Sequence, residues 1–492
     1  MQGLGRPITS WEDDHHRFVA VGEELHWGKN WRTFPDFLFH YVKKVLTPEW
    51  GAAEQAKSAR DRHSLFAWLE KIRELRERDT KAKKGEVVSS IMTGAVKAYL
   101  GLAYDLYLSA HNAELPERLL KRLRNRDQFE GAVYEAFVIG CFAKAGFSIE
   151  FEDEDDSSVS HCEFTATHKE TGRKFSVEAK AVTTASKRSG KSKEPPKIRG
   201  YLVDALRKQA AHPRIVFIEL SRAHSIDESG SPEWVAHVNA QLIQCEKEIT
   251  IEGGPAPAAY VFITNRAFVH DLDDPACVEL WAAGGFKIED FPPGRSARTM
   301  LELHRARQAH LEVHWLLKAL ATHQEIPTSF DDRLPEELSG DMPEVTLRIG
   351  DTYLVPNAAG EEVAGVLADA VVVVPERKAY GTYRLANGES ILCTVPLTDA
   401  EMRAHGRSPE TFFGTVKHVS KGIKEPLEAF DFVYATYSKS TREKLLEFMV
   451  EWPQIEELRK LGQQELAEHY AAGIASQMWD DIANERTKLT RK

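Results

Sequence analysis

The first part of the chain, residues 1–112, shows the hydrophobic spacing of helices. Over residues 64–78, apolar side chains recur every three or four positions, at Leu65, Trp68, Leu69, Ile72 and Leu75. Half of the ten tryptophans fall in this part of the chain, at positions 11, 27, 31, 50 and 68. Because an amphipathic helix buries its apolar face, we expect a packed helical N-terminal domain here rather than a partner-binding module.

Residues 113–322 alternate between helical and strand patterns. A helix is predicted over 127–145, where Phe129, Val133, Phe137 and Cys141 recur every four residues, and Gly146 is its natural stop. The elements expected after it are strands at 147–151, 162–167, 174–181, 215–220 and 259–264, and helices at 200–211 and 233–247. A hairpin turn at 170–173 joins the second and third strands. This order predicts an α/β (α+β) domain with a mixed sheet flanked by helices.

The last third of the chain is separated from this domain by an acidic stretch. Before it, a strand is expected at 286–291 and a long helix at 297–320. Residues 325–344 contain seven acidic residues, one arginine and three prolines, so 323–344 is predicted to be a linker. Residues 345–492 form a predicted α+β domain, with strands at 345–354, 366–374, 380–385 and 390–395. A helical tail follows, and Ser440 and Glu443 have the spacing of a capping box at its start.

Composition narrows the class of protein without identifying it. The 492 residues carry 28% charged and 42% hydrophobic residues, a mix that excludes disordered and fibrous chains. No apolar stretch reaches the ~18–20 residues of a membrane helix, and the N-terminal acids and histidines are unlike a signal peptide. The five cysteines are scattered and form no CxxC pair. We therefore expect a cytoplasmic protein with no membrane contact.

The formal net charge of −11 conceals one strongly basic segment. Residues 180–214 contain ten lysines and arginines against two acids, which gives this segment a charge of +8. Local positive charge of this kind is typical of a surface that contacts the phosphate backbone of nucleic acid. The cations expected to bind nucleic acid are Lys187, Arg188, Lys191, Lys193, Lys197, Arg199, Arg207 and Lys208.

Candidate catalytic chemistry lies on the strand before this basic segment. In Phe175–Lys180 the side chains of a strand alternate, so Glu178 and Lys180 share the face opposite Phe175 and Val177. Glu163 lies on the paired strand, so two carboxylates can meet around one hard cation. Mg²⁺ binds one or two carboxylates and keeps waters for phosphate oxygens, and Mn²⁺ is an alternative. Lys180 would then orient the attacking water or neutralise the scissile phosphate.

The pattern resembles that of the PD-(D/E)xK restriction-endonuclease-like nucleases. It has an acid on one strand, Glu-x-Lys on the next strand, and a preceding helix that carries Glu135. The helix that carries Glu135 and ends at Gly146 is most similar to the Holliday-junction-resolvase and Mrr-type branches. The resemblance covers about 100 residues, 127–220, and implies a restriction-endonuclease-like core over 113–322. It also implies a supporting role for Glu135, and for Gln209 as a polar residue on the next helix. One departure is that the strand acid is Glu163, where the family usually has aspartate after proline.

The leading expectation is a Mg²⁺-dependent endonuclease, acting on DNA more readily than on RNA. Such multi-domain proteins act in restriction, phage defence or repair, which the resemblance implies for this chain only by analogy. Whether it forms a homodimer or needs a partner protein stays open. A second hypothesis is a nuclease-like protein that binds nucleic acid or assembles without cutting, and a third is a scaffold with no nucleic-acid partner.

Three other patterns favour a simpler structural interpretation. The run 185–192 resembles a P-loop, but Pro195 and Pro196 disfavour the helix that a P-loop requires. The cluster at 270–274 is expected to be a capped loop, and the acidic run at 152–156 a solvated loop. If Glu178 and Lys180 were only an exposed ion pair on a strand, the nuclease hypothesis would lose its main support.

Overall fold

The computed structural model describes residues 8–79, 90–112, 115–151, 162–181, 197–222, 232–275, 279–292, 299–330, 347–356, 360–407, 409, 412–413 and 425–490. It has two compact units, one of residues 1–286 and 316–417 and one of residues 287–315 and 418–492. The domain boundaries predicted at residues 112, 322 and 344 stay predictions. His323 and Phe330, within the expected linker, are buried, and residues 331–344 lie outside the described residues.

The described part of the chain begins with strands, which the helical expectation for the N-terminal part missed. β1 (Ser10–Asp13), β2 (His16–Val21) and β3 (Glu24–Gly28) form an antiparallel sheet. Asp14 and His15 have positive φ values of 43° and 60°, as expected for the two central residues of a tight hairpin turn. The helices that follow are α1 (Phe34–Val45), α2 (Pro48–Gln55), α3 (Ser64–Asp79), α4 (Gly94–Ala110), α5 (Glu117–Arg124) and α6 (Phe129–Lys144). The prediction of a helical N-terminal domain is therefore correct only after residue 33.

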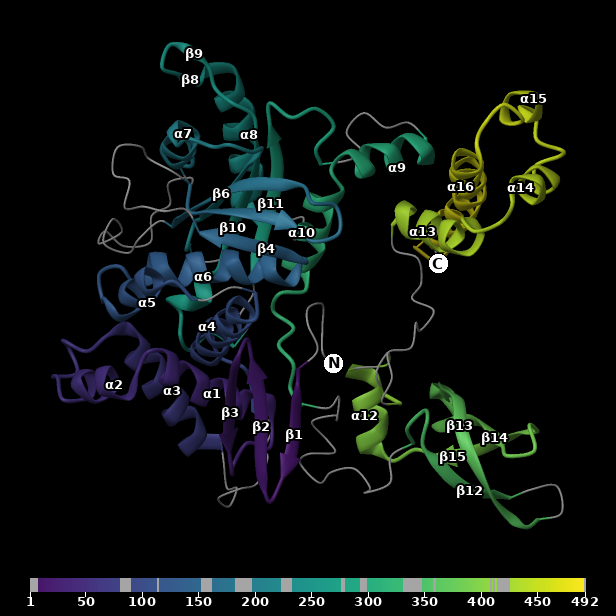
Figure 1. The fold of residues 1–492 in the computed structure, drawn as a ribbon, viewed down its shortest axis with the longest axis horizontal. Helices are drawn as coiled ribbons and strands as arrows, with labels where there is room; N and C mark the ends of the chain where they lie inside the picture. The colour runs from purple at the N-terminus through teal and green to yellow at the C-terminus, as the bar shows by residue number, and fades with distance from the viewer. Residues whose placement is uncertain are drawn as a thin grey trace. The chain divides into compact units, whose positions relative to one another are not determined.

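The first unit contains a six-stranded mixed sheet, in the order β11-β10-β7-β6-β5-β4 (Figure 1). Its strands are β4 (Phe147–Phe151), β5 (Phe164–His168), β6 (Lys174–Ala181), β7 (Arg214–Glu219), β10 (Ala259–Asn265) and β11 (Leu280–Phe286). β6, β7 and β10 run parallel, and the outer pairs are antiparallel. The strands predicted at 147–151 and 174–181 are confirmed to the residue. The strand predicted at 286–291 is wrong, because β11 ends at Phe286.

Helices cover both faces of this sheet. On one face, Phe142 of α6 contacts Phe217 of β7, with ring centroids 6.1 Å apart. On the other face, α7 (Arg199–Arg207) and α8 (Glu233–Glu248) share a hydrophobic core with Val216 and Ile218. A short hairpin of β8 (Thr250–Ile251) and β9 (Gly254–Pro255) follows α8. The predicted mixed sheet flanked by helices is confirmed.

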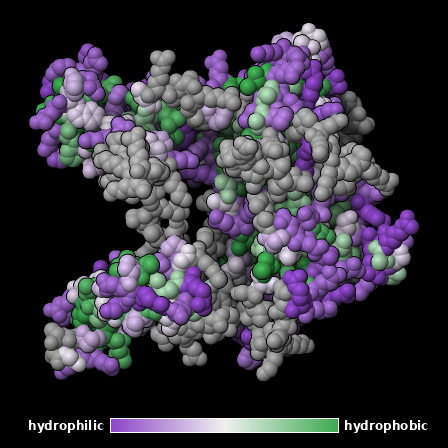
Figure 2. Space-filling view, turned by 180° about the vertical axis from the view of Figure 1, so that it is seen from behind, coloured by the Kyte–Doolittle hydropathy of each residue, from purple (hydrophilic) through white to green (hydrophobic). Residues whose placement is uncertain are grey.

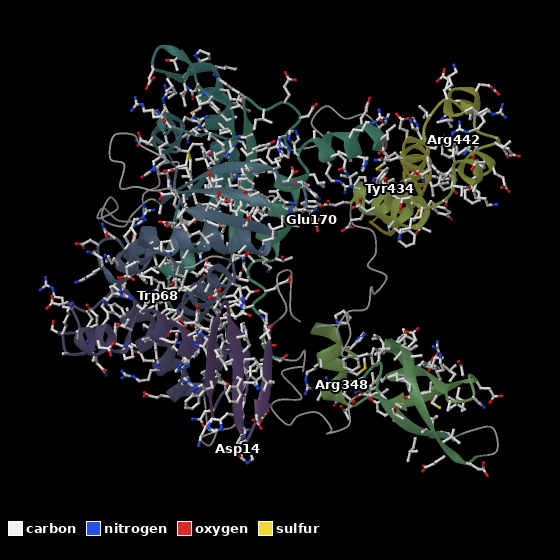
Figure 3. All side chains as sticks on the ribbon, in the orientation of Figure 1. Asp14, Trp68, Glu170, Arg348, Tyr434 and Arg442 are labelled. Atoms are coloured by element: carbon white, nitrogen blue, oxygen red, sulfur yellow. The ribbon has the colours of Figure 1, made fainter. Side chains whose placement is uncertain are left out.

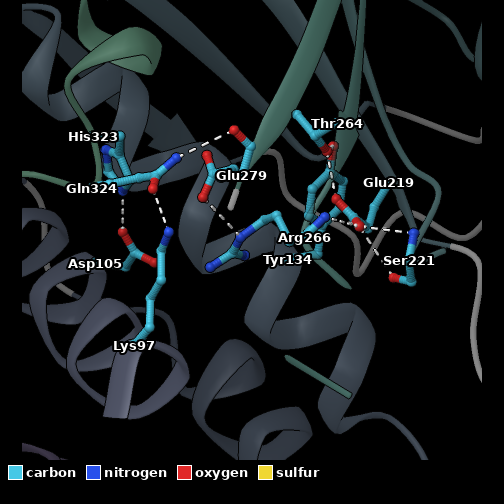
Figure 4. A network of polar contacts seen from close by, with 10 residues as sticks. All are labelled: Lys97, Asp105, Tyr134, Glu219, Ser221, Thr264, Arg266, Glu279, His323 and Gln324. Atoms are coloured by element: carbon cyan, nitrogen blue, oxygen red, sulfur yellow. Dashed lines mark hydrogen bonds and ion pairs between the residues drawn. The ribbon is translucent and has the colours of Figure 1, made fainter. Parts of the chain in front are cut away.

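Buried polar contacts fix α6 against the carboxyl ends of β7 and β10 (Figure 4). The Tyr134 hydroxyl lies 2.9 Å from the Thr264 hydroxyl, which donates to Glu219 Oε2 at 2.6 Å. The backbone N–H of Arg266 donates to Glu219 Oε1 at 2.8 Å. Because buried polar groups need partners, these contacts define the rotation of α6, and with it the direction of the neighbouring Glu135.

A second network in the same picture ties the residues after α10 (Leu311–Ala321) to α4 and α6 (Figure 4). His323 Nε2 lies 2.6 Å from Asp105 Oδ1, and both side chains are buried. Gly140 of α6 makes room for this pair, since a Cβ there would lie 2.5 Å from Asp105 Oδ1. The start of the predicted linker is therefore part of a packed interior.

The β-rich part of residues 347–413 has its own core. β12 (Thr352–Pro356), β13 (Glu362–Val373), β14 (Lys378–Leu385) and β15 (Ser390–Pro396) form an antiparallel sheet. Helix α12 (Asp399–Arg407) follows them and contributes Ala400 and Ala404 to the core of this sheet. Four strands were predicted in this region, although the first begins at Thr352 rather than at residue 345.

The second unit is helical. It comprises α9 (Met300–Ala309), α13 (Pro426–Tyr437), α14 (Arg442–Phe448), α15 (Ile455–Leu458) and α16 (Gln463–Thr490). Arg307 forms a bidentate ion pair with Asp431, at 2.5 and 2.8 Å, between α9 and α13. The helix predicted over 297–320 is instead α9 and α10, separated at His310, and Thr441 caps the start of α14.

Among the described helices, none is both long and apolar enough to cross a membrane. Figure 2 shows one face of the molecule, on which hydrophilic residues predominate and hydrophobic areas are small and separate.

Candidate active site

Three carboxylates predicted to cooperate do lie in one cluster. Glu135 points from α6, Glu178 from β6, and Glu163 lies immediately before β5. The Glu163 N–H donates to the Val177 carbonyl at 3.0 Å, which holds Glu163 beside the strand that carries Glu178. Glu135 and Glu178 are 2% and 1% exposed. The simple alternative, in which Glu178 is only a solvated residue on a strand, is therefore excluded.

Four cations surround these carboxylates. Lys180 Nζ lies 2.6 Å and Lys208 Nζ 2.9 Å from the same oxygen, Glu178 Oε1. Lys208 Nζ is also 3.6 Å from Glu163 Oε1, so this one ammonium bridges two carboxylates. The carboxylates can therefore lie close to one another, because the neighbouring ammonium groups offset their mutual repulsion.

Two of the cations come from α5. Arg118 Nη2 lies 3.5 Å from Glu163 Oε2 and 3.8 Å from Glu135 Oε1, and Arg122 forms a close ion pair with Glu135 Oε2. Their positions follow from the local sequence, because Leu119 and Leu123 are buried while residues 118 and 122 lie one turn apart. The helix therefore presents two guanidinium groups to the carboxylates of α6 and β5.

Burial changes the proton affinities in the cluster. Burial raises the pKa of Glu178 and of Glu135 above the ordinary value, and the Glu163 carboxylate raises both further. Burial alone would lower the pKa of Lys208, but Glu178 and Glu163 more than offset this and raise it. Both carboxyl groups therefore gain from a nearby positive charge, whether from a side chain or from a metal ion.

One oxygen of the cluster is suited to a cation. Glu178 Oε2 is buried and accepts no hydrogen bond from the described residues. No group of three His, Cys, Asp or Glu side chains in the described ranges is arranged to hold a metal. Two carboxylates, Glu163 and Glu178, are however enough for Mg²⁺ or Mn²⁺ when waters complete the coordination. The donor set is all oxygen and fits these hard cations.

The remaining predicted residues are either exposed or lie outside the described residues. α7 ends at Arg207, so Gln209 follows the helix and is exposed rather than projecting from it. Arg199 forms an exposed ion pair with Glu248 at 2.6 Å, and Arg207 is 65% exposed near Asp204. Lys197 is exposed as well. The predicted nucleic-acid contacts Lys187, Arg188, Lys191 and Lys193 lie outside the described residues, as do the runs at 152–156 and 185–192.

Three residues of the cluster had no catalytic or supporting role in the sequence-based prediction. Lys208 was expected to contact phosphate only, and its place beside Glu178 follows from the end of α7 one residue earlier. Arg118 and Arg122 were not predicted at all. Their four-residue spacing in a short helix before the Glu135 helix was the available signal.

Comparisons with known proteins add no identification. No protein-family model, curated protein or solved structure matches this chain. Its function must therefore be inferred from the cluster itself.

Proposed function

We propose that the chain is a Mg²⁺-dependent nuclease that hydrolyses phosphodiester bonds, with DNA as the preferred substrate. The observation that carries this proposal is the convergence of Glu163, Glu178 and Lys180 at one point of a mixed sheet. Glu135 reaches the same point from α6, and Lys208 from the position directly after α7. A purely structural strand pair would not need five ionisable groups from four segments of the chain.

Glu163 and Glu178 would hold the ion, and the buried Glu178 Oε2 accepts no hydrogen bond from the described residues. When bound, Mg²⁺ supplies positive charge that lowers the pKa of water and stabilises charge on phosphate oxygens. Lys180, with its ammonium 2.6 Å from Glu178, would orient the attacking water or neutralise the scissile phosphate.

The surrounding residues support this arrangement. Arg118 and Arg122 would fix Glu135 and Glu163 in place, since Arg118 pairs with both carboxylates and Arg122 with Glu135. The exposed cations Lys197, Arg199 and Arg207 would contact the nucleic-acid backbone. Binding should therefore weaken as the salt concentration rises.

A second candidate is a nuclease-like protein that binds nucleic acid without cutting it. One observation favours it: four cations already neutralise three carboxylates, so the cluster is electrostatically satisfied without a metal. The same ion pairs would serve a metal site only if Lys208 or Arg118 moved when the ion bound. The two candidates differ in whether the chain turns over substrate.

Cleavage assays on the full chain separate the two. Supercoiled plasmid, single-stranded DNA and RNA are incubated with Mg²⁺, Mn²⁺ or EDTA, using wild type, Glu178→Gln and Lys180→Met. Lys174→Met is the matched control, because Lys174 lies on the same strand and its side chain is 43% exposed. We expect metal-dependent cutting by wild type and by the control, and a loss of about a hundredfold or more in the other two variants.

Two results would contradict the proposal. Cutting that survives in Glu178→Gln and Lys180→Met would place the activity elsewhere. If wild type binds DNA in a salt-dependent way but does not cut any substrate with either metal, the non-cutting candidate is correct.

A further inference from the structure

The outer face of the N-terminal three-stranded sheet carries a row of aromatic rings. Trp11 on β1 pairs with Phe18 on β2, which pairs with Trp27 on β3, so the three side chains lie side by side across the sheet. The Trp11 and Phe18 rings stack with centroids 5.3 Å apart and an interplanar angle of 7°. His16 meets Trp27 edge-on at 5.5 Å. We call Trp11, His16, Phe18 and Trp27 the aromatic row.

The opposite face of the same sheet is covered, and the aromatic row is not. Val19, Val21 and His26 point inward and are almost completely buried. Trp11 and Trp27 are 44% and 59% exposed. Clusters of exposed aromatic side chains are uncommon unless they bind a ligand or partner, and exposed tryptophans are typical of binding surfaces.

Negative charge surrounds the aromatic row. Residues 8–30 contain five acidic side chains against one arginine and one lysine. Arg17 is paired with Glu12 at 2.9 Å, and Glu24 with Lys44 at 2.8 Å. Asp13, Asp14 and Glu23 are exposed and have no ion pair among the described residues; Asp14 lies at the tip of the β1–β2 turn (Figure 3).

The negative charge determines which class of ligand the aromatic row can bind. Aromatic rings on a sheet can stack on the bases of single-stranded nucleic acid, but such surfaces need positive charge for the phosphates. Here the carboxylates would repel phosphates. They would attract guanidinium or ammonium groups, which also bind favourably over the faces of tryptophan rings. The ligand chemistry is therefore cationic.

We propose that the aromatic row is a docking surface for an arginine-rich segment of a partner protein. Two guanidinium groups would stack on Trp11 and Trp27, and Asp13, two residues from Trp11 on the same face of β1, would pair with one of them. The two tryptophans are two strand spacings apart, about 9–10 Å, which a polyproline II segment spans in about three residues while it places side chains i and i+3 on the same side. The preferred segment therefore has two arginines separated by two other residues. This surface is independent of the carboxylate cluster and of the proposed nuclease activity.

The test measures binding of short peptides to the full chain. A fluorescein-labelled peptide with the pattern Arg-Gly-Gly-Arg is titrated by fluorescence anisotropy beside a Glu-Gly-Gly-Glu peptide and an oligo-dT of similar length. Variants Trp27→Ala and Trp11→Ala remove one ring each, and Phe432→Ala is the control, since Phe432 is 65% exposed on α13. Because all three side chains are largely solvent-exposed, thermal unfolding should change little in each variant.

We expect the arginine peptide to bind more tightly than the other two ligands. Each tryptophan variant should weaken that binding by about fivefold or more, and Phe432→Ala should not. Asp13→Asn should weaken it too and make it less sensitive to salt. Equal binding of both peptides, or binding unchanged in both tryptophan variants, would overturn the proposal. Oligo-dT binding that depends on the tryptophans, or a dimer that dissociates in Trp27→Ala, would assign the surface to another occupant and also overturn it.

Discussion

Replacing Lys208 by methionine tests the electrostatic structure of the carboxylate cluster. Lys208 Nζ is 2.9 Å from Glu178 and 3.6 Å from Glu163, and its side chain is 17% exposed. Methionine keeps most of the length and removes the charge. Arg207→Met is the matched control, because the neighbouring Arg207 is 65% exposed and its ion pair with Asp204 is 4.0 Å long.

The expected magnitude follows from burial. An exposed ion pair contributes up to about 1 kcal/mol, and removing one partner of a fully buried pair costs about 3–5 kcal/mol. Lys208 lies between these limits, because Glu178 is 1% exposed while the lysine retains some contact with water. We expect Lys208→Met to lower the free energy of unfolding by about 1–3 kcal/mol and Arg207→Met by less than about 0.5 kcal/mol. Without Lys208, the pKa of Glu178 rises further.

Two measurements check this prediction. Urea unfolding followed by circular dichroism gives the loss of stability, and plasmid cleavage in Mg²⁺ gives the loss of activity, expected at about tenfold to a hundredfold. Arg207→Met should unfold like wild type and lose only some affinity for DNA. If Lys208→Met unfolds and cuts like wild type, or if Arg207→Met shows the larger loss, the bridging role of Lys208 is refuted.

Two further predictions concern the interior. Gly140→Ala places a Cβ 2.5 Å from Asp105 Oδ1, so it should lower the free energy of unfolding by about 1–3 kcal/mol. Gly101→Ala, in α4 with 3.8 Å to its nearest neighbour, should instead raise it by about 0.5–1 kcal/mol; equal effects in urea unfolding would contradict the packing described here. Burial lowers the pKa of His63 to about 4, so its contribution to stability is complete above the ordinary value of 6.5 and is lost as the pH falls toward 4. His63→Asn should therefore lose less thermal stability than wild type between about pH 7 and pH 5, and parallel curves would show that His63 titrates normally.

The six-stranded sheet and α6, the helix that precedes it, could be predicted from the sequence because local patterns determine them. α6 has its apolar residues at helical spacing and ends before Gly146, whose φ of +90° suits glycine. Gly172, with a φ of +69°, allows the turn between β5 and β6. That the Glu178 and Lys180 side chains share one face of β6 then follows from strand alternation alone.

Other elements depend on contacts that no local pattern contains. β11 includes Gly284 and Gly285, which disfavour a strand in a sequence-based prediction. A Cβ at Gly284 would lie 2.7 Å from Leu242 Cδ2, so this leucine of α8 packs closely on the glycine of the strand. Similarly, Arg118 and Arg122 enter the cluster only because α5 packs beside α6. The N-terminal strands are four to six residues long, too short to be distinguished from loops by periodicity.

The central claim is that the carboxylate cluster hydrolyses phosphodiester bonds with a divalent ion. Its most direct test is the rate of plasmid cleavage by wild type and Glu178→Gln, with Mg²⁺ and with EDTA, at equal concentrations of folded protein. We expect cutting by wild type only, abolished by EDTA and absent in Glu178→Gln at every Mg²⁺ concentration. Cutting by Glu178→Gln at the wild-type rate would contradict it.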